Sequence, residues 1–191
     1  MNEKKFDVKK LQKLNNPARL KDIPPQSIVA RLDGATPAVM IEIGAGTGFF
    51  SIALAELLKP VTLYACDISP TMVDWMTENV VFAHPEIIPI QSGETGIPLP
   101  DGIADLLFMI NLHHELDDPV QTIAESCRLL RTGGTLVVID WKKQEMNDGP
   151  PQRMRYQAET VAEQLLAGGF ARITPHDDLP KHFMVVARKG K

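Results

Sequence analysis

Short apolar runs alternate along the chain with segments whose apolar side chains recur every three or four positions. The runs are rich in branched residues and are typical of strands that are buried on both faces. The segments between them have the spacing of amphipathic helices. This alternation predicts an α/β protein in which helices cover both faces of a mostly parallel sheet.

The predicted elements follow one another closely from residue 38 onward. Strands are predicted over 38–43, 61–66, 86–90, 104–110, 133–140, 171–177 and 182–189, and helices over 49–58, 67–80, 118–130 and 158–170. The stretch "SGETGIPLPDG" has no helical pattern, and we expect a loop there. The last two strands are joined without a helix, so we expect them to pair in antiparallel.

The helical patterns also predict which side chains face the core. They are Phe50, Leu54, Leu57 and Leu58 in the first helix, Val120, Ile123, Ala124, Cys127 and Leu130 in the third, and Val161, Ala162, Leu165 and Leu166 in the fourth. In the second helix, Ser69 is expected to cap the N-terminus and Pro70 to take the first helical position.

Residues 1–36 precede this alternation and contain the helix breakers "NNPARL" and "IPPQS". We therefore divide the chain into an N-terminal helical arm over 1–36 and a domain over 37–191. The arm is expected to cover a ligand pocket as a lid. The residues expected to do so are Phe6, Leu11, Leu14, Pro17, Arg19 and Leu20.

Composition narrows the class of protein. The 191 residues have a net charge of −4, which gives no indication of a nucleic-acid or anionic-membrane partner. No run of 18 apolar residues predicts a membrane span, and the first residues do not resemble a secretory signal. The only cysteines, Cys66 and Cys127, form neither a disulfide framework nor a metal-ligand pattern. We expect a cytoplasmic protein without a bound metal.

The stretch "IEIGAGTGFF" joins the first strand to the first helix through three glycines. A dinucleotide-binding turn has its third glycine three places after the second, where this chain has Phe49. The spacing here is G-x-G-x-G, and no lysine follows as in a phosphate-binding loop. Three glycines in one turn leave the backbone uncovered for close approach of a ligand.

Two acids flank this turn. Glu42 lies inside an apolar strand, where an unpaired carboxylate is costly, and it serves either to fix the loop or to attract a cationic group of a ligand. Asp67 ends the second strand, where a carboxylate accepts hydrogen bonds from ribose hydroxyls or caps a helix. Together these acids suit a ligand with a ribose and positive charge but no phosphate. S-adenosylmethionine (SAM) has these groups.

Four stretches of the chain, in this order, resemble the motifs of one family. "VMIEIGAGTGFFSIALAE", "YACDISPTMVDWM", "IPLPDGIADLLFMINLHHELDDP" and "ESCRLLRTGGTLVVIDWKK" resemble the motifs of class I SAM-dependent methyltransferases, in particular the small ubiquinone-methyltransferase-like branch. The resemblance covers about residues 37–191. It implies a Rossmann-like three-layer sandwich with a seven-stranded, mostly parallel sheet and an antiparallel last strand.

The resemblance also implies a set of cofactor contacts. Glu42, Gly44, Ala45, Gly46 and Gly48 would shape the methionine end of the SAM pocket, Asp67 would bind the ribose, Ile68 and Met72 would flank the adenine, and Asn111 and Leu112 would border the methionine and the acceptor. The family usually has an acid before the "LPFPD" loop that meets the adenine amino group. This chain has Gly93 at that place and Glu94 one residue later, so both are candidates for the adenine contact.

Acceptor chemistry is expected in "NLHHELDD". His113 and His114 follow the fourth strand, and either one takes a proton from the acceptor or orders the loop and the next helix. Trp141 either packs or binds substrate, and Arg19 and Tyr156 are candidates for contact with an anionic or polar acceptor. The mechanism implied by the resemblance is direct in-line displacement on the sulfonium methyl, which requires no catalytic triad.

The leading hypothesis is therefore a SAM-dependent methyltransferase acting on a small molecule, with S-adenosylhomocysteine as the product. Nucleic-acid acceptors are disfavoured because the chain has no basic surface pattern and no "NPPY" or "DPPY" signature. A non-catalytic SAM-binding regulator and, less favoured, an NAD-dependent oxidoreductase are the alternatives. The motifs name neither the acceptor nor the oligomeric state.

Overall fold

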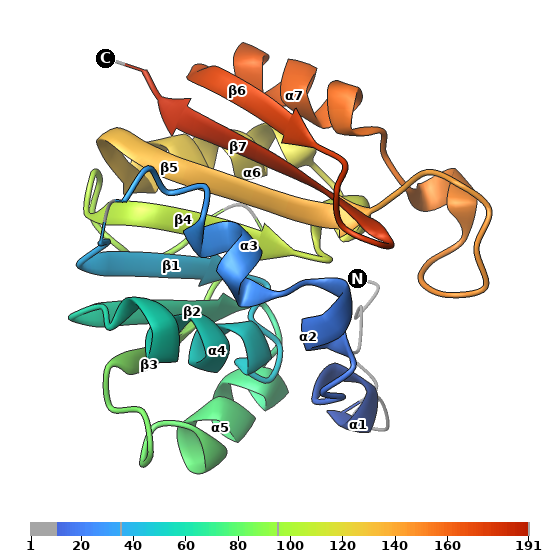
Figure 1. The fold of residues 1–191 in the computed structure, drawn as a ribbon. Helices are drawn as coiled ribbons and strands as arrows, with labels where there is room; N and C mark the ends of the chain where they lie inside the picture. Colours follow the sequence, from blue (N-terminus) through green and yellow to red (C-terminus); the bar gives the residue numbers. More distant parts are fainter. Residues whose placement is uncertain (1–10, 35, 95, 191) are drawn as a thin grey trace.

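The computed structural model describes residues 11–34, 36–94 and 96–190, and its centre is one seven-stranded sheet (Figure 1). The strands are β1 (Val39–Ile43), β2 (Thr62–Asp67), β3 (Ile87–Gln91), β4 (Ala104–Ile110), β5 (Leu130–Trp141), β6 (Phe170–His176) and β7 (His182–Lys189). Their order is β3-β2-β1-β4-β5-β7-β6. The first five strands pair in parallel, and β7 runs antiparallel between β5 and β6. The predicted fold class is confirmed.

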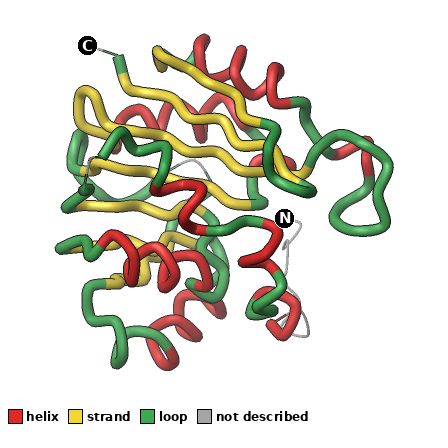
Figure 2. Tube along the Cα trace, in the orientation of Figure 1, coloured by secondary structure: helices red, strands yellow, loops and turns green. Residues whose placement is uncertain are grey.

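Helices cover both faces of this sheet (Figures 1 and 2). They are α1 (Leu11–Leu14), α2 (Arg19–Asp22), α3 (Pro25–Val29), α4 (Phe49–Leu58), α5 (Pro70–Asn79), α6 (Pro119–Leu129) and α7 (Ala158–Ala167). In Figure 1, α3, α4 and α5 lie on one face, and α6 and α7 lie on the other. The stretch between β3 and β4 has no helix among its described residues, as the sequence predicts.

Two apolar clusters separate the layers. Met40, Leu106 and Phe108 point to the side of α3 and α4, whereas Ile41 and Leu107 point to the side of α6 and α7. Neighbouring residues of a strand point to opposite faces, which is why a sheet covered on both sides needs continuously apolar strands. The arm contributes to the first cluster through fully buried side chains. These are Ile23, Ile28 and Leu32.

Four of the predicted core positions are wrong. Leu57 is 44% exposed, Val120 70% and Leu166 66%, and Ala124 is exposed as well. These residues lie at the border of each helix's apolar stripe, so periodicity alone places them on the buried side. In α4 and α6 the buried stripe is shifted toward polar residues, namely Ser51, Thr122 and Ser126.

Polar residues fill the inner face of α6 instead. Thr122 and Ser126 are buried, and their hydroxyls donate to the carbonyls of Asp118 and Thr122, at 3.1 and 2.8 Å. A buried hydroxyl that bonds to the preceding turn leaves no polar group unpaired. Cys127, predicted in the core, is half-buried beside the second cluster.

The start of α5 differs from the expectation in one detail. Pro70 takes the first helical position, but the Ser69 side chain makes no capping hydrogen bond. The Asp67 carboxylate instead accepts a hydrogen bond from the Ser69 backbone N–H at 2.9 Å. The strand's final acid therefore fixes the turn that leads into the helix, and the first helical N–H groups have no side-chain cap.

The parallel strands direct their last residues to one edge of the sheet, at the right of Figure 1. The chain first builds β1, β2 and β3 toward one side and then returns to place β4 on the other side of β1. Such a reversal of strand order opens a crevice for ligands beyond the carboxyl ends of the strands. Among the described residues, no helix is long and apolar enough to cross a bilayer.

Candidate functional site

The glycine turn lies at this edge, between β1 and α4. Gly44, Gly46 and Gly48 have φ angles of +73°, +57° and +71°, values that side-chain-bearing residues rarely adopt. A Cβ atom on Gly44 would lie 2.8 Å from the Leu112 side chain. The backbone N–H groups of Gly44 and Ala45 donate to the Cys66 carbonyl, at 2.8 and 3.0 Å. These bonds anchor the turn to the end of β2.

Glu42 lies beneath the turn and is 2% exposed. Its carboxylate accepts a hydrogen bond from the Ser51 hydroxyl of α4, so it holds the turn to the helix that follows. Burial raises the pKa of Glu42 to about 8, although Ser51 and the Arg19 charge oppose the shift. A cationic ligand group brought to this acid would favour its ionised form.

Asp67 serves the turn from the neighbouring strand. Its carboxylate accepts from the Gly46 N–H at 2.7 Å and from the Ser69 N–H at 2.9 Å. Burial raises the pKa of Asp67 despite these two bonds. Each carboxylate oxygen accepts more than one hydrogen bond, so both retain capacity for a ribose diol. The capping and ligand-binding interpretations of Asp67 are therefore compatible.

Asn111 directly follows β4, the other neighbour of β1. Its φ of +58° places it in the left-handed region, and its backbone N–H donates to the Ile139 carbonyl at 2.8 Å. Its Oδ1 atom is buried and has no hydrogen-bond partner among the described residues. A strained residue with an unpaired buried acceptor is characteristic of ligand sites.

The residues predicted to contact the adenine differ in how exposed they are. Ile68 is 44% exposed, whereas Met72 is 1% exposed and offers little surface to a ligand. The Gly93 N–H donates to the Gly96 carbonyl at 2.8 Å, which closes a tight turn. Glu94 is exposed in that turn. Ile68, directly after β2, and Glu94 with its loop backbone thus have the exposure that an adenine contact requires.

The arm covers the glycine turn from outside. The Thr47 hydroxyl donates to Asn15 Oδ1 at 2.7 Å, and a Cβ atom on Gly46 would lie 3.2 Å from the Leu14 side chain. Figure 1 shows α1 and α2 beside the carboxyl edge. The lid interpretation fits these contacts, whereas Phe6 and the side chain of Leu11 lie outside the described residues.

Arg19 is the charged residue of this cover. Its guanidinium lies 5.3 and 4.7 Å from the ring centres of Phe49 and Phe50, and it donates to the Leu14 carbonyl at 2.6 Å. Burial lowers the pKa of Arg19, and the nearby Glu42 partly restores it. Among the described residues no carboxylate forms a salt bridge with Arg19, so an anionic ligand group would be stabilised there.

The two adjacent histidines, His113 and His114, contact different parts of the fold. His114 Nδ1 lies 2.8 Å from Asp140 Oδ1, and its backbone N–H donates to the same carboxylate at 2.9 Å. Burial alone would lower the pKa of His114, but hydrogen bonds to Asp140 and Glu115 raise it to about 9. His114 is therefore protonated at neutral pH, beside the end of β5.

His113 is turned toward α7 and is fully buried. Its Nε2 atom lies 2.8 Å from Gln164 Oε1, and its ring meets the Tyr156 ring edge-to-face at 4.9 Å. Burial lowers the pKa of His113. These contacts favour the loop-ordering interpretation of His113 and give Tyr156 a packing role beside it.

Trp141 ends β5 and is half-buried. His182 lies on its ring at 4.2 Å between centres, and a Cβ atom on Gly149 would lie 2.6 Å from the indole. Arg155, which is 4% exposed, stabilises the long loop from β5 to α7 at the far right of Figure 1. The Arg155 guanidinium donates to the carbonyls of Lys142, Gln144, Asp148 and Pro150.

Sequence reasoning missed three residues of this edge: Asp140, His182 and Arg155. Asp140 ends an apolar strand, which is the signal that singles out Glu42 and Asp67, and the same rule applied to "LVVID" finds it. His182 and Arg155 carry no such signal. Their importance depends on the pairing of β5 with β7 and on the path of a loop.

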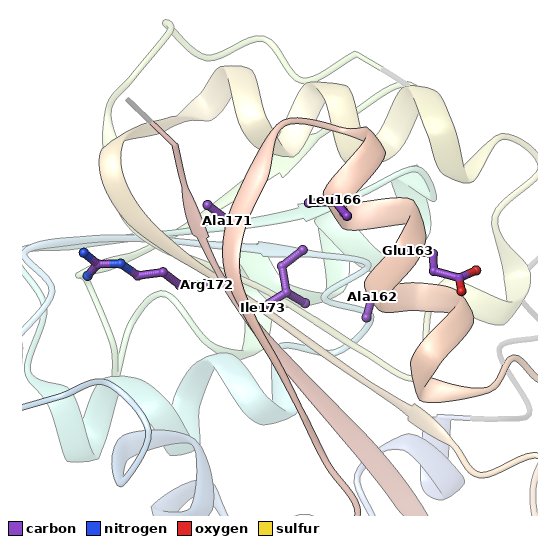
Figure 3. A pocket seen from close by; sticks show the side chains of 6 residues that line it. All are labelled: Ala162, Glu163, Leu166, Ala171, Arg172 and Ile173. Atoms are coloured by element: carbon purple, nitrogen blue, oxygen red, sulfur yellow. The ribbon is translucent and has the colours of Figure 1, made fainter.

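A recess in the described part of the chain lies elsewhere. It has a volume of about 350 Å³ and opens between α7 and β6 at the far edge of the sheet (Figure 3). Its lining is Ala162, Glu163, Leu166, Ala171, Arg172 and Ile173. None of these residues neighbours the glycine turn, so the recess is separate from the site.

The residues of the edge fit SAM. Glu42 and the unpaired Asn111 oxygen suit its cationic groups, Asp67 suits the ribose, and the bare glycine backbone allows close approach. The same edge has no lysine or arginine in the glycine turn itself to neutralise a pyrophosphate.

Known proteins agree with this assignment. A family model for the methyltransferase domain matches residues 41–138, just over half of the chain, so the chain belongs to that family. A SAM-dependent methyltransferase from Aquifex aeolicus is 30% identical, with a TM-score of 0.87 over 96% of this chain and 99% of that one. The fold and the cofactor class are therefore those of the class I SAM-dependent methyltransferases.

Two curated relatives have more specific names. A malonyl-acyl-carrier-protein O-methyltransferase of Hahella chejuensis is 31% identical over 59% of this chain and 39% of its own length. A tRNA(Phe) aminocarboxypropyltransferase of Methanocaldococcus jannaschii is 26% identical over 67% of this chain and 50% of its own length. This chain thus spans half or less of the length of these relatives.

Proposed function

We propose that the protein transfers a methyl group from SAM to a small-molecule acceptor. The observation that carries the proposal is the glycine turn held between Glu42 and Asp67, next to the residues that follow β4, where the Asn111 oxygen has no partner among the described residues. This arrangement provides anionic and hydrogen-bond-accepting groups around an uncovered backbone. It matches a cationic nucleoside without phosphates better than a dinucleotide.

The protein's part in the reaction is to hold and enclose the reactants. When bound, SAM supplies a methyl group activated by a sulfonium for in-line displacement. The glycine turn and its two acids bind and orient the cofactor. Arg19 and the arm exclude water, and the acceptor enters beside His114 and Asp140. Positioning in a dry site provides most of the acceleration of such a displacement.

His114 has a defined protonation state in this scheme. Because its pKa is raised to about 9, it donates hydrogen bonds at neutral pH rather than accepting a proton. An acceptor that arrives deprotonated would be stabilised by this cation. An acceptor that arrives protonated needs His114 in its neutral form, so its methylation would accelerate as the pH approaches 9.

Two measurements test the proposal. Calorimetry should detect SAM and S-adenosylhomocysteine and no NAD, and release of S-adenosylhomocysteine should follow addition of a suitable small acceptor. Binding of NAD without SAM would refute the proposal. Binding of SAM with no turnover over a broad acceptor panel would favour the non-catalytic regulator.

The net charge of the chain favours small acceptors over RNA. Nucleic-acid affinity depends on phosphate neutralisation by Lys and Arg, whereas this chain has a net charge of −4. Because one relative is named for an activity on tRNA, RNA should be compared with small molecules as the acceptor. Methylation of bulk tRNA at a rate exceeding that of every small molecule would reject the small-molecule part of the proposal.

A further inference from the structure

His182 opens β7 opposite the last residue of β5. Trp141 is its pairing partner, and the two rings lie 4.2 Å apart between centres at an angle of 45°. The residue is 2% exposed, yet both ring nitrogens lack a hydrogen-bond partner among the described residues. A neutral imidazole has one donor and one acceptor, so two polar functions are left unmet in a buried place.

The charged groups around His182 do not meet this need. Lys181 forms ion pairs with Asp22 at 3.0 Å and with Asp148 at 2.7 Å. Asp140 accepts from His114 and from the Trp141 N–H. The neighbouring charges therefore have partners of their own.

Burial keeps the ring of His182 neutral. It lowers the pKa of His182 to about 4, outweighing the attraction of Asp140 and Asp22 for a proton. Lys181 and Arg19 act in the same direction as burial. The side chain therefore offers an uncharged donor–acceptor pair at neutral pH.

His182 lies where the edge of the sheet meets the arm. Lys181, the residue before it, forms an ion pair with Asp22 of α2 at 3.0 Å. Arg19 begins the same helix, and its guanidinium lies 4.7 Å from the ring centre of Phe50, two residues after the glycine turn. His182 is therefore located where the end of β5 and the start of β7 meet the arm that covers the glycine turn.

We propose that His182 binds an oxygen group, a hydroxyl or a carboxylate, of the methyl acceptor and so selects the acceptor. The inference rests on the proposed methyltransferase function. An oxygen group satisfies the ring N–H, and a hydroxyl satisfies the second nitrogen as well. A cationic amine is disfavoured because an ammonium group only donates hydrogen bonds and leaves the ring N–H without an acceptor.

The test uses the full chain saturated with S-adenosylhomocysteine and three probes with one planar ring: phenol, benzoate and benzylamine. Binding is measured by calorimetry, and the ¹⁵N resonances of the five histidines are followed by NMR. Phenol or benzoate should shift the His182 ring signals and leave those of His84 unchanged. Benzylamine should bind at least tenfold more weakly than the better oxygen probe.

Variants separate binding from folding. His182→Phe removes both nitrogens and keeps a ring against Trp141, and we expect unchanged or higher Tm, unchanged affinity for S-adenosylhomocysteine and at least tenfold weaker probe binding. His182→Asn, which keeps a donor and an acceptor, should retain part of the affinity. His84→Phe, at the opposite edge of the sheet, is the matched control and should bind the probes as the wild type does.

The contrary outcomes are distinct. Failure of the wild type to bind S-adenosylhomocysteine would overturn the proposed function and this inference with it. With that binding intact, the inference alone is overturned if neither oxygen probe binds, if benzylamine binds as well as they do, or if His182→Phe binds the probes normally. Should His182→Phe fail to fold, the wild-type ¹⁵N shifts decide between the same two results.

Discussion

At the scale of single residues, the site is built from acids at or next to the ends of apolar strands. Asp67 is the last residue of β2, and Glu42 and Asp140 are the last but one of β1 and β5. Each fixes a neighbouring segment by accepting hydrogen bonds. A carboxylate is costly in this position unless it is paired. Buried acids that organise loops therefore also mark where a ligand is bound.

Asp67 gives the most direct test of the cofactor site. Asp67→Ala should weaken SAM binding by about 1.5–3 kcal/mol, the range for hydrogen bonds to a charged group. It should also lower Tm, because the Gly46 and Ser69 N–H groups lose their acceptor. Isothermal calorimetry measures the first effect. Asp74→Ala, on the exposed side of α5, is the control, and equal SAM affinity in the two variants would remove Asp67 from the site.

His114 predicts a dependence of stability on pH. Its pKa is raised from 6.5 to about 9 in the folded protein, so its contribution is fully present below about pH 6.5 and is lost as the pH rises through 9. The free energy of unfolding of the wild type should fall over this window more steeply than that of His114→Asn, which does not titrate. Urea unfolding at a series of pH values measures the slopes.

Glu42 also makes the free energy of unfolding fall with rising pH, but at lower pH, since its pKa is raised to about 8. Wild type and variant are therefore compared at each pH. His84→Asn controls for loss of a histidine at the other end of the sheet. Parallel curves for wild type and His114→Asn would contradict the Asp140 pairing.

At the scale of elements, two irregular segments complete the edge. The arm rests on the glycine turn through Leu14 and Asn15, and the loop from β5 to α7 rests on Trp141 through Gly149. Neither segment belongs to the alternating pattern of strands and helices. Function is commonly carried by such segments when a rigid sheet positions them.

Arg19 tests the arm. Arg19→Ala removes a buried cation and its packing on Phe49 and Phe50, and we expect weaker SAM binding and at least tenfold lower turnover. SAM calorimetry and the release of S-adenosylhomocysteine provide the two measurements. Lys21→Ala, an exposed cation of the same short helix, serves as control. The lid role would be rejected if Arg19→Ala changed neither quantity.

Arg155 tests the second segment. Its guanidinium satisfies four backbone carbonyls, so Arg155→Gln should free the loop over 142–150 and cost about 1–3 kcal/mol of local stability. Hydrogen exchange should accelerate in that loop and little in the central strands. Arg153→Gln, on an exposed neighbour, should leave exchange unchanged. Uniform acceleration over the whole sheet would point to global destabilisation instead.

At the scale of the whole molecule, the order of the strands creates the site. Reversal between β1 and β4 brings together residues far apart in the chain, such as Gly44 and Leu112. The antiparallel β7 then adds His182 to the same edge from the opposite chain direction.

The sequence by itself determined the layer architecture, because burial on two faces requires continuously apolar strands. It also determined the cofactor class, because the glycine spacing and the acids near the strand ends can be read from the order of the residues. The tertiary structure alone decided the contacts at the ends of β4 and β5. Whether His113 or His114 meets Asp140, whether Trp141 is covered, and where His182 lies depend on contacts between segments 26 to 41 positions apart along the chain. No local pattern encodes such contacts, since they arise from strand pairing and side-chain burial in the assembled fold.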